Sequence, residues 1–192
     1  VFAPTTIGFP HGLTRDDAVT YANANTNYSR LMNTTVAGEA SPIVVVGASN
    51  VLLARAEAAN LGWTAEDYTA LYNSALDQSW QQWGVFDASD IANYKANADV
   101  NLGSASGTVA QKIATQQWLA WYPNGVQGWS VWRKTGYPAL VPAPGTTAIP
   151  RRVPYGPNEP QLNGANYAPA AANDQDGSGA NSAFVRLWWD MP

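Results

Sequence analysis

The chain has 192 residues, a formal net charge of -4 and no cysteine. Hydrophobic residues make up 46%, enough for a core, while charged residues make up only 12%, about half of the roughly 25% that is typical. With this acidic balance we expect no basic surface that would attract phosphate groups. We therefore predict no nucleic-acid partner and no binding to an anionic membrane surface. The lack of cysteine excludes disulfides and thiolate nucleophiles.

The ends of the chain and its apolar runs also bear on its class. No apolar run approaches the roughly 20 residues that a membrane-spanning helix requires. The chain begins at Val1 without an initiator Met or a basic leader, so we expect it to be mature, trimmed or cut from a longer protein. Nine Trp and nine Tyr suit a dense aromatic core, and they also suit uncharged ligands that stack on rings, such as sugars.

Residues 1–41 form a polar, loop-rich entry segment with one helix signal. Thr14 and Asp17 have the spacing of a capping box, and Asp16 adds a second anion to the first turn. We therefore predict a helix over about residues 15–25.

The same segment carries our candidate ligand-binding residues, which are aromatic, cationic or imidazole side chains on a polar background. They are Phe9, His11, Tyr21, Tyr28 and Arg30. Exposed aromatic faces with polar groups at the rim are typical of sugar-binding surfaces. The alternative is that these side chains cap a helical core.

Residues 42–84 predict a helical hairpin. The first helix runs from a cap near Ser49 to Gly62, and the second is capped by Thr64 and Asp67 and ends at Gly84. Together they span close to the roughly 34 residues of a tetratricopeptide unit. Because one unit cannot bury its own face, about three stacked repeats are usually needed, and we expect this piece to fold poorly alone.

Residues 85–138 continue the helical pattern. A short helix is predicted over residues 87–97 with Ser89 as a possible cap, and residues 98–107 are read as a linker. Two further helices lie between residues 111 and 138, separated by residues 123–125, and Gly136 supplies the C-cap of the second.

Two tryptophan pairs three residues apart mark those last two helices. They are Trp118 with Trp121 and Trp129 with Trp132. Such pairs form either a packed core or a stacking platform for a ligand, and the helical spacing favours the core.

Residues 139–192 are rich in proline and glycine and show almost no periodic pattern. Low-complexity disorder is one reading, and an extended tail that wraps a larger body is the other. Apolar and aromatic anchors favour the tail. Arg151 and Arg152 either form a fork for an anion or pair with acids such as Glu159 or Asp190, and the pairing is favoured.

Several of these stretches resemble the SusD/RagB family in the order that the family has them. The helix pair contributes the segments ARAEAANLGW (54–63) and LYNSALDQSWQQWG (71–84). The next stretch contributes Gln116, Gln117, Trp118, Leu119, Ala120, Gly125, Trp129, Arg133, Thr135, Gly136, Tyr137 and Pro138. The tail contributes Ile149, Pro150, Arg151, Arg152, Tyr155, Pro157, Glu159, Asn163, Asn166, Arg186, Leu187, Trp188, Trp189 and Asp190. Gly156 and Lys134 depart from the pattern.

The resemblance implies an all-α fold, with residues 1–192 as the C-terminal portion of one SusD-like domain more than twice as long. It implies a position on the outward face of the outer membrane, held by a lipid on a cysteine outside this chain. It also implies non-catalytic capture of a glycan, or another oligomeric nutrient, for a TonB-dependent (SusC-like) transporter. The alternative is a helical-repeat scaffold that binds a protein or peptide, and a Trp-lined glycosidase is a weaker third reading. Helical spacing or family position also marks five tryptophans as structural, namely Trp63, Trp80, Trp83, Trp188 and Trp189.

Catalytic and metal chemistry have little support in the sequence. His11 is the only histidine and no Gly-x-Ser-x-Gly elbow is present, so a serine hydrolase is not predicted. No spacing singles out the carboxylate pair that glycoside hydrolysis needs. Asp174 and Asp176 are similar to the middle of an EF-hand calcium loop, but Ala172 and Ala183 occupy positions where that loop has calcium ligands. We predict no enzyme, no metal and no cofactor.

Overall fold

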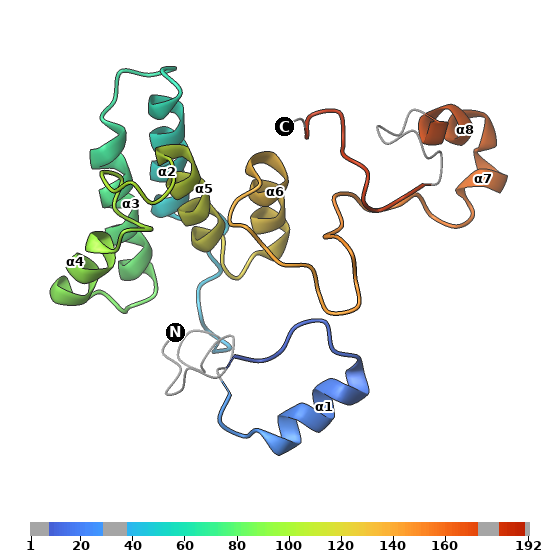
Figure 1. Ribbon diagram of the computed structural model, residues 1–192, viewed down its shortest axis with the longest axis horizontal. Coiled ribbons are helices and arrows are strands. Elements are labelled where there is room, and N and C mark those ends of the chain that lie inside the picture. The colour runs from blue at the N-terminus through green and yellow to red at the C-terminus, as the bar shows by residue number, and fades with distance from the viewer. Residues whose placement is uncertain (1–7, 29–37, 173–180, 191–192) are drawn as a thin grey trace. The chain divides into compact units, whose positions relative to one another are not determined.

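The computed structural model describes residues 8–28, 38–172 and 181–190. All regular structure in these ranges is helical, as Figure 1 shows, so the all-α prediction is confirmed. The helices are α1 (Arg15–Ala24), α2 (Ala48–Asn60), α3 (Tyr68–Gln82), α4 (Ala88–Ala96), α5 (Val109–Ala120), α6 (Gly125–Thr135), α7 (Glu159–Leu162) and α8 (Gly164–Ala172). The chain divides into two compact units, Val1–Pro138 and Ala139–Pro192, each described by itself below.

Helix α1 forms where the capping residues place it. The Thr14 hydroxyl accepts a hydrogen bond from the Asp17 backbone N–H at 3.2 Å, and Asp16 and Asp17 lie in the first turn. The helix is solvated, because none of its residues is buried. It therefore owes its form to local capping rather than to packing.

The predicted hairpin is present as α2 and α3, although its first cap differs from the prediction. Helix α2 begins after Gly47, whose N–H donates to the Asn50 side-chain oxygen at 2.9 Å. The predicted cap position lies near Ser49, which is itself buried inside the first turn, two residues after the actual cap. Gly62 ends the helix in the left-handed region at φ 76°, as predicted. The Asp67 carboxylate caps α3 by accepting from the N–H groups of residues 69 and 70.

Helix α5 supplies the packing partner that the hairpin lacks on its own. It packs against both α2 and α3, and α6 packs on α5. Leu53 of α2, Tyr72 and Leu76 of α3 and Ile113 of α5 are almost fully buried in one cluster. Gln117 of α5 also donates to the Leu53 carbonyl at 3.4 Å. One further helix from the same chain thus covers the apolar face of the tetratricopeptide-type pair.

Helix α4 and the segment that follows it close the end of this core. Asp87 caps α4, not Ser89, because the Asp87 carboxylate reaches the N–H groups of both Ser89 and Asp90. Ile91 of this helix is buried in the core. The Tyr94 hydroxyl accepts a hydrogen bond from the side-chain amide nitrogen of Gln116 in α5, at 2.8 Å.

The tryptophans of α5 and α6 are only partly a core. Trp132 is buried, whereas Trp118, Trp121 and Trp129 are half-buried. The Arg133 guanidinium lies over the Trp129 ring, 3.7 Å from its centroid. The core interpretation is therefore correct in full only for Trp132.

The structural interpretation of the other tryptophans divides in the same way. Trp80 packs against the core. Trp63, at the tip of the α2–α3 turn, is 76% exposed, and Trp188 is 82% exposed. Helical spacing or family position did not decide burial at these two sites, since both lie outside helices.

The second unit is more ordered than the extended tail that the sequence predicted. Residues 159–172 form α7 and α8. Proline at the first turn of α7 loses no helical hydrogen bond, and the alanines of α8 favour a helix despite Pro169. The unit is also stabilised by the fully buried Asp190, which forms ion pairs with Arg151 and Arg186.

Among the described residues, no helix combines the length and apolar character needed to cross a bilayer.

Candidate functional site

Three of the five predicted ligand-binding residues meet in one aromatic cluster, Phe9, Tyr21 and Tyr28. The Phe9 ring meets the Tyr21 ring edge-on at a centroid distance of 5.2 Å, and the Tyr28 ring at 4.9 Å. Tyr21 comes from α1, whereas Phe9 and Tyr28 flank that helix on either side. The helix thus brings together rings that are far apart in the sequence.

The cluster is open to solvent and carries hydrogen-bonding groups. Phe9 is 39% exposed, and Tyr21 and Tyr28 are half-buried. The Tyr21 hydroxyl donates to the Gly8 carbonyl at 3.4 Å, and the Asn25 amide donates to the Tyr21 carbonyl at 3.0 Å. Rings with exposed faces beside amides and hydroxyls can stack on an apolar face of a ligand and bind its hydroxyl groups.

The other two predicted residues are not brought into this cluster. His11 is exposed in the bend after Pro10 and takes no part in the ring contacts. Arg30 lies outside the described residues. The assignment of all five residues to ligand binding stays a prediction.

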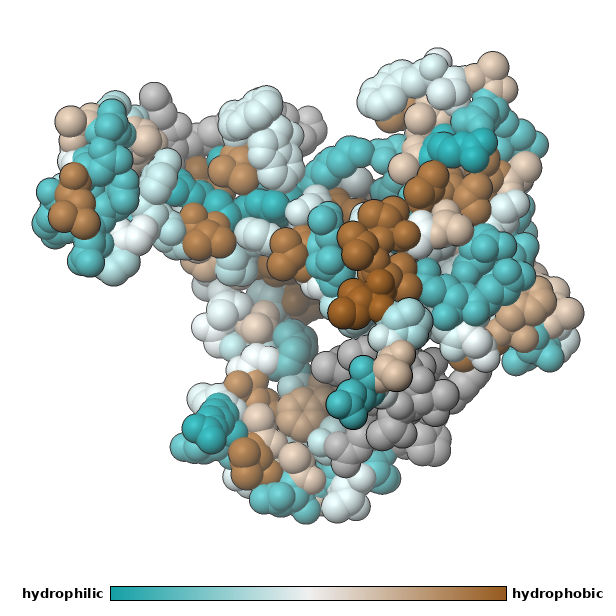
Figure 2. All heavy atoms as spheres, turned by 180° about the vertical axis from the view of Figure 1, so that it is seen from behind, coloured by the Kyte–Doolittle hydropathy of each residue, from teal (hydrophilic) through white to brown (hydrophobic). Residues whose placement is uncertain are grey.

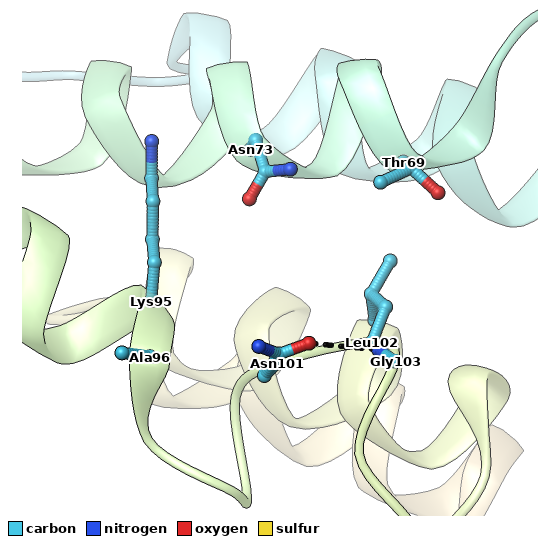
Figure 3. Close-up of a pocket in the computed structure, with 7 residues that line it drawn as sticks. All are labelled: Thr69, Asn73, Lys95, Ala96, Asn101, Leu102 and Gly103. Atoms are coloured by element: carbon cyan, nitrogen blue, oxygen red, sulfur yellow. Dashed lines mark hydrogen bonds between the residues drawn. The ribbon is translucent and has the colours of Figure 1, made fainter.

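Two pockets in the first unit were not predicted. One has a volume of about 300 Å³ and lies between α3, α4 and the segment before α5, with Asn73, Lys95 and Asn101 on its walls (Figure 3). The other has a volume of about 260 Å³ and lies between α2, α5 and the end of α6, with Glu57 and Tyr137 on its walls. Each pocket is built from three separate segments, so no local sequence motif predicts it.

Three carboxylates of the first unit, Glu57, Glu66 and Asp87, have structural roles. The Arg55 side chain hydrogen-bonds to Glu66 and holds the pKa of that carboxyl below its usual value. The hydroxyl of Ser89 and the N–H groups of residues 89 and 90 lower the pKa of Asp87. Glu57 binds Lys134 at 2.6 Å and Gln117 at 2.9 Å. These groups are explained by caps and ion pairs and give no acid–base pair for catalysis.

Metal binding likewise has no support in the part of the chain that the structure describes. No group of three or more histidine, cysteine or acidic side chains gathers there in a way that could hold an ion. Asp174 and Asp176, with their weak likeness to a calcium loop, lie outside the described residues.

The described residues define an all-helical protein built around a tetratricopeptide-type helix pair. Residues 4–156 match the SusD-like family, which is described as starch-binding and associating with the outer membrane. The chain belongs to this SusD-like family. Members of the family are binding proteins rather than enzymes, and they are associated with the outer membrane.

Solved structures give the same result. A SusD-like protein described as Bacteroidetes AC2a is 30% identical, with a TM-score of 0.64 over 75% of this chain and 30% of its own. A chitin-binding protein is also 30% identical, with a TM-score of 0.61 over 75% of this chain and 33% of its own. A SusD homologue from Bacteroides thetaiotaomicron VPI-5482 is 26% identical, with a TM-score of 0.68 over 98% of this chain and 44% of its own.

The chain therefore spans less than half the length of these three structures. No curated protein matches the sequence.

Proposed function

We propose that this chain takes part in non-catalytic binding of a glycan, or another oligomeric nutrient, at the cell surface. The observation that carries the proposal is the match of residues 4–156 to a family described as starch-binding. A chitin-binding protein at 30% identity adds a second polysaccharide among the similar structures. The net charge of -4 suits a neutral glycan better than an acidic one.

The proposed binding surface is the aromatic cluster Phe9, Tyr21 and Tyr28, with His11 and Arg30 as further contacts. The exposed ring faces offer stacking area to a sugar ring at little entropic cost, because aromatic side chains have few rotatable bonds. In a longer SusD-like chain these residues would form one edge of a larger site.

The proposal includes delivery of the glycan to a TonB-dependent (SusC-like) transporter, which the protein would cover as a lid. It also includes a lipid anchor that holds the longer protein on the outward face of the outer membrane. Both follow from the family resemblance. The chain itself is proposed as the C-terminal portion, in segments 1–41, 42–84, 85–138 and 139–192.

A helical-repeat scaffold for a protein or peptide partner is the second candidate. The observation in its favour is the apolar segment before α2, where Ile43 is 91% exposed and residues 44–46 are also exposed valines. Figure 2, in which hydrophobic residues are brown, shows that hydrophobic side chains are exposed at several places on this face of the molecule. Co-purification with an outer-membrane barrel protein, together with no affinity for any glycan, would favour this candidate.

The test is calorimetric titration of the protein with malto- and chito-oligosaccharides, comparing the unchanged chain with Phe9→Ala. Removing the ring takes away about 1.5–3 kcal/mol of apolar contact, so we expect affinity to fall by about 10- to 100-fold. Phe86→Ala is the matched control, because Phe86 is 44% exposed in the loop between α3 and α4 and is not part of the cluster.

Chromatography of the mixtures should show intact oligosaccharide and no shorter products. Release of shorter sugars would instead favour the glycosidase reading. Equal affinity of the unchanged chain and Phe9→Ala would remove the aromatic cluster from the site, and no binding of any oligosaccharide would overturn the proposed function.

A further inference from the structure

The pocket beside α3 has the size of a single-ring ligand. Its volume is about 300 Å³, at the lower end of the roughly 300–1,000 Å³ of small-molecule sites. Figure 3 shows Thr69 and Asn73 of α3 on one side, with Asn101 and Leu102 on the other and the Lys95 side chain at one end. The pocket is therefore lined by hydroxyl, amide and ammonium groups with two apolar side chains, Ala96 and Leu102.

Several of these polar groups have hydrogen-bonding capacity to spare. The Thr69 hydroxyl and the Asn73 amide form no hydrogen bond with any other residue that the structure describes. The Asn101 side-chain oxygen accepts from the Gly103 N–H at 2.8 Å, which leaves its amide nitrogen as a donor. A ligand with several hydroxyl groups would meet both donors and acceptors here.

The wall of the pocket that contains Asn101 and Leu102 is fixed by hydrogen bonds from buried side chains of α3 and α5. Lys112 of α5 is buried, and its ammonium donates to the Asn101 carbonyl at 2.6 Å and to the Ser104 hydroxyl at 2.7 Å. The buried Tyr72 hydroxyl donates to the Val100 carbonyl at 2.9 Å. Residues 98–107, which the sequence suggested as a linker, are thus a fixed wall, and a ligand would not have to order them.

The charge of the pocket excludes a strongly anionic ligand. Its one cation, Lys95, is already paired with Asp77 of α3 at 2.6 Å. An unpaired cation would attract phosphate or carboxylate, whereas a paired one serves as an additional donor to a neutral group.

We infer that this pocket binds one neutral, hydroxyl-rich ring, such as a hexose, with Asn73 and Asn101 as its polar contacts and Leu102 against its apolar face. The inference rests on the proposed function, which supplies the class of ligand. It adds a second sugar subsite that does not use the Phe9 cluster. The ring is either a free monosaccharide or one residue of an oligosaccharide.

The test follows backbone amide signals of residues 101–103 by NMR, during separate titrations with glucose, N-acetylglucosamine and the malto- and chito-oligosaccharides. We expect these signals to shift, and Asn73→Ala to weaken the response about tenfold, as for loss of a buried hydrogen bond. The fold should survive, because alanine is the better helix former within α3. Asn93→Ala, on an exposed position of α4, is the matched control and should bind like the unchanged chain.

The outcomes separate this inference from the proposed function. Shifts with glucose or N-acetylglucosamine support a monosaccharide subsite, and shifts with oligosaccharides alone support a subsite for one residue of a longer glycan. Oligosaccharide binding that is sensitive to Phe9→Ala but leaves residues 101–103 unchanged overturns the pocket and keeps the proposed function. An equal response of Asn73→Ala and the unchanged chain also overturns the pocket. No binding of any sugar overturns both.

Discussion

The two units of this chain are stabilised in different ways. In the first, α2, α3 and α5 bury a cluster of apolar side chains that includes Leu53, Leu76 and Ile113. Among the described residues of the second, the fully buried side chain is a carboxylate, Asp190, and the buried apolar residues are the smaller Ala171 and Val185. The first unit thus depends on removing apolar area from water, and the second on satisfying a buried charge.

The difference follows from what each stretch of sequence can form. Residues 48–135 contain long helices with apolar faces, whereas the second unit offers only the short helices α7 and α8 between proline-rich segments. There the Asp190 carboxylate accepts from Arg151 at 2.6 and 2.5 Å and from Arg186 at 3.2 Å. A unit with little regular structure can still have one defined arrangement if its buried polar groups have partners. Three substitutions test this comparison.

The largest effect is expected for Asp190→Ala. It leaves Arg151 without its carboxylate in a largely buried position, and breaking a buried ion pair costs about 3–5 kcal/mol. We expect amide hydrogen exchange to accelerate across residues 149–172 and 181–190, while helices α2, α3 and α5 keep their protection. Asp16→Asn, on the solvated helix α1, should leave both units unchanged. Loss of protection in both units together would show that they unfold as one, contrary to the comparison.

Leu53→Ala should weaken the first unit nearly as much. Leu53 is 1% exposed between α2, α3 and α5, and truncating such a leucine costs about 2–5 kcal/mol because a cavity remains. Urea unfolding followed by tryptophan fluorescence measures the loss. Leu119→Ala is the control, since Leu119 of α5 is 43% exposed and should cost far less. Similar losses for the two variants would mean that the buried cluster does not determine the stability of this unit.

The smallest effect, about 1–2 kcal/mol at neutral pH, is expected for Tyr72→Phe. The substitution removes the hydrogen bond to the buried Val100 carbonyl. Burial raises the pKa of the Tyr72 hydroxyl well above its usual value. An unfolded tyrosine ionises near roughly pH 10, so the folded state holds the proton more tightly and the stability from Tyr72 is lost as pH rises above about 10.

Thermal melts at pH 7 and pH 11 measure both parts of this prediction. The unchanged chain should lose more stability between the two pH values than Tyr72→Phe does, since phenylalanine has no proton to release. An equal alkaline loss in the two proteins would assign the pH dependence to other tyrosines.

The sequence was most informative where a local signal acts alone. The side chains of Thr14 and Asp67 can reach free N–H groups, and Gly62 and Gly136 adopt positive φ, so these helix ends were predicted correctly. Asp190 is one of the acids that the sequence predicts as a partner of Arg151 and Arg152, and it pairs with Arg151.

The errors arose where two local signals compete or where the decisive contact is distant. At the start of α4, Asp87 and Ser89 are both good caps, and the structure selects Asp87. The cap of α2 was predicted near Ser49, but Gly47 is the cap and tertiary packing buries Ser49. Helices α7 and α8 were missed because proline obscured a short, alanine-rich pattern.

The candidate sites show the same limit. The residue types of the aromatic cluster were chosen from sequence, but the contacts of Phe9 with Tyr21 and Tyr28 depend on how the chain turns around α1. The pocket beside α3 could not be predicted. Its walls come from three segments, and the Asn73 amide forms no hydrogen bond with another described residue, which only the three-dimensional structure shows.

The exposed segment Ile43–Val46 has a practical consequence for anyone who prepares this chain. Four successive exposed β-branched side chains without a charge form an apolar patch, and Pro42 and Gly47 limit the run to fewer than the roughly six or seven residues of a cross-β segment. Concentrated stocks are therefore expected to associate through contact between these apolar patches. A lysine in place of Val45, which is 77% exposed, would act as a gatekeeper against that assembly without disturbing any buried contact.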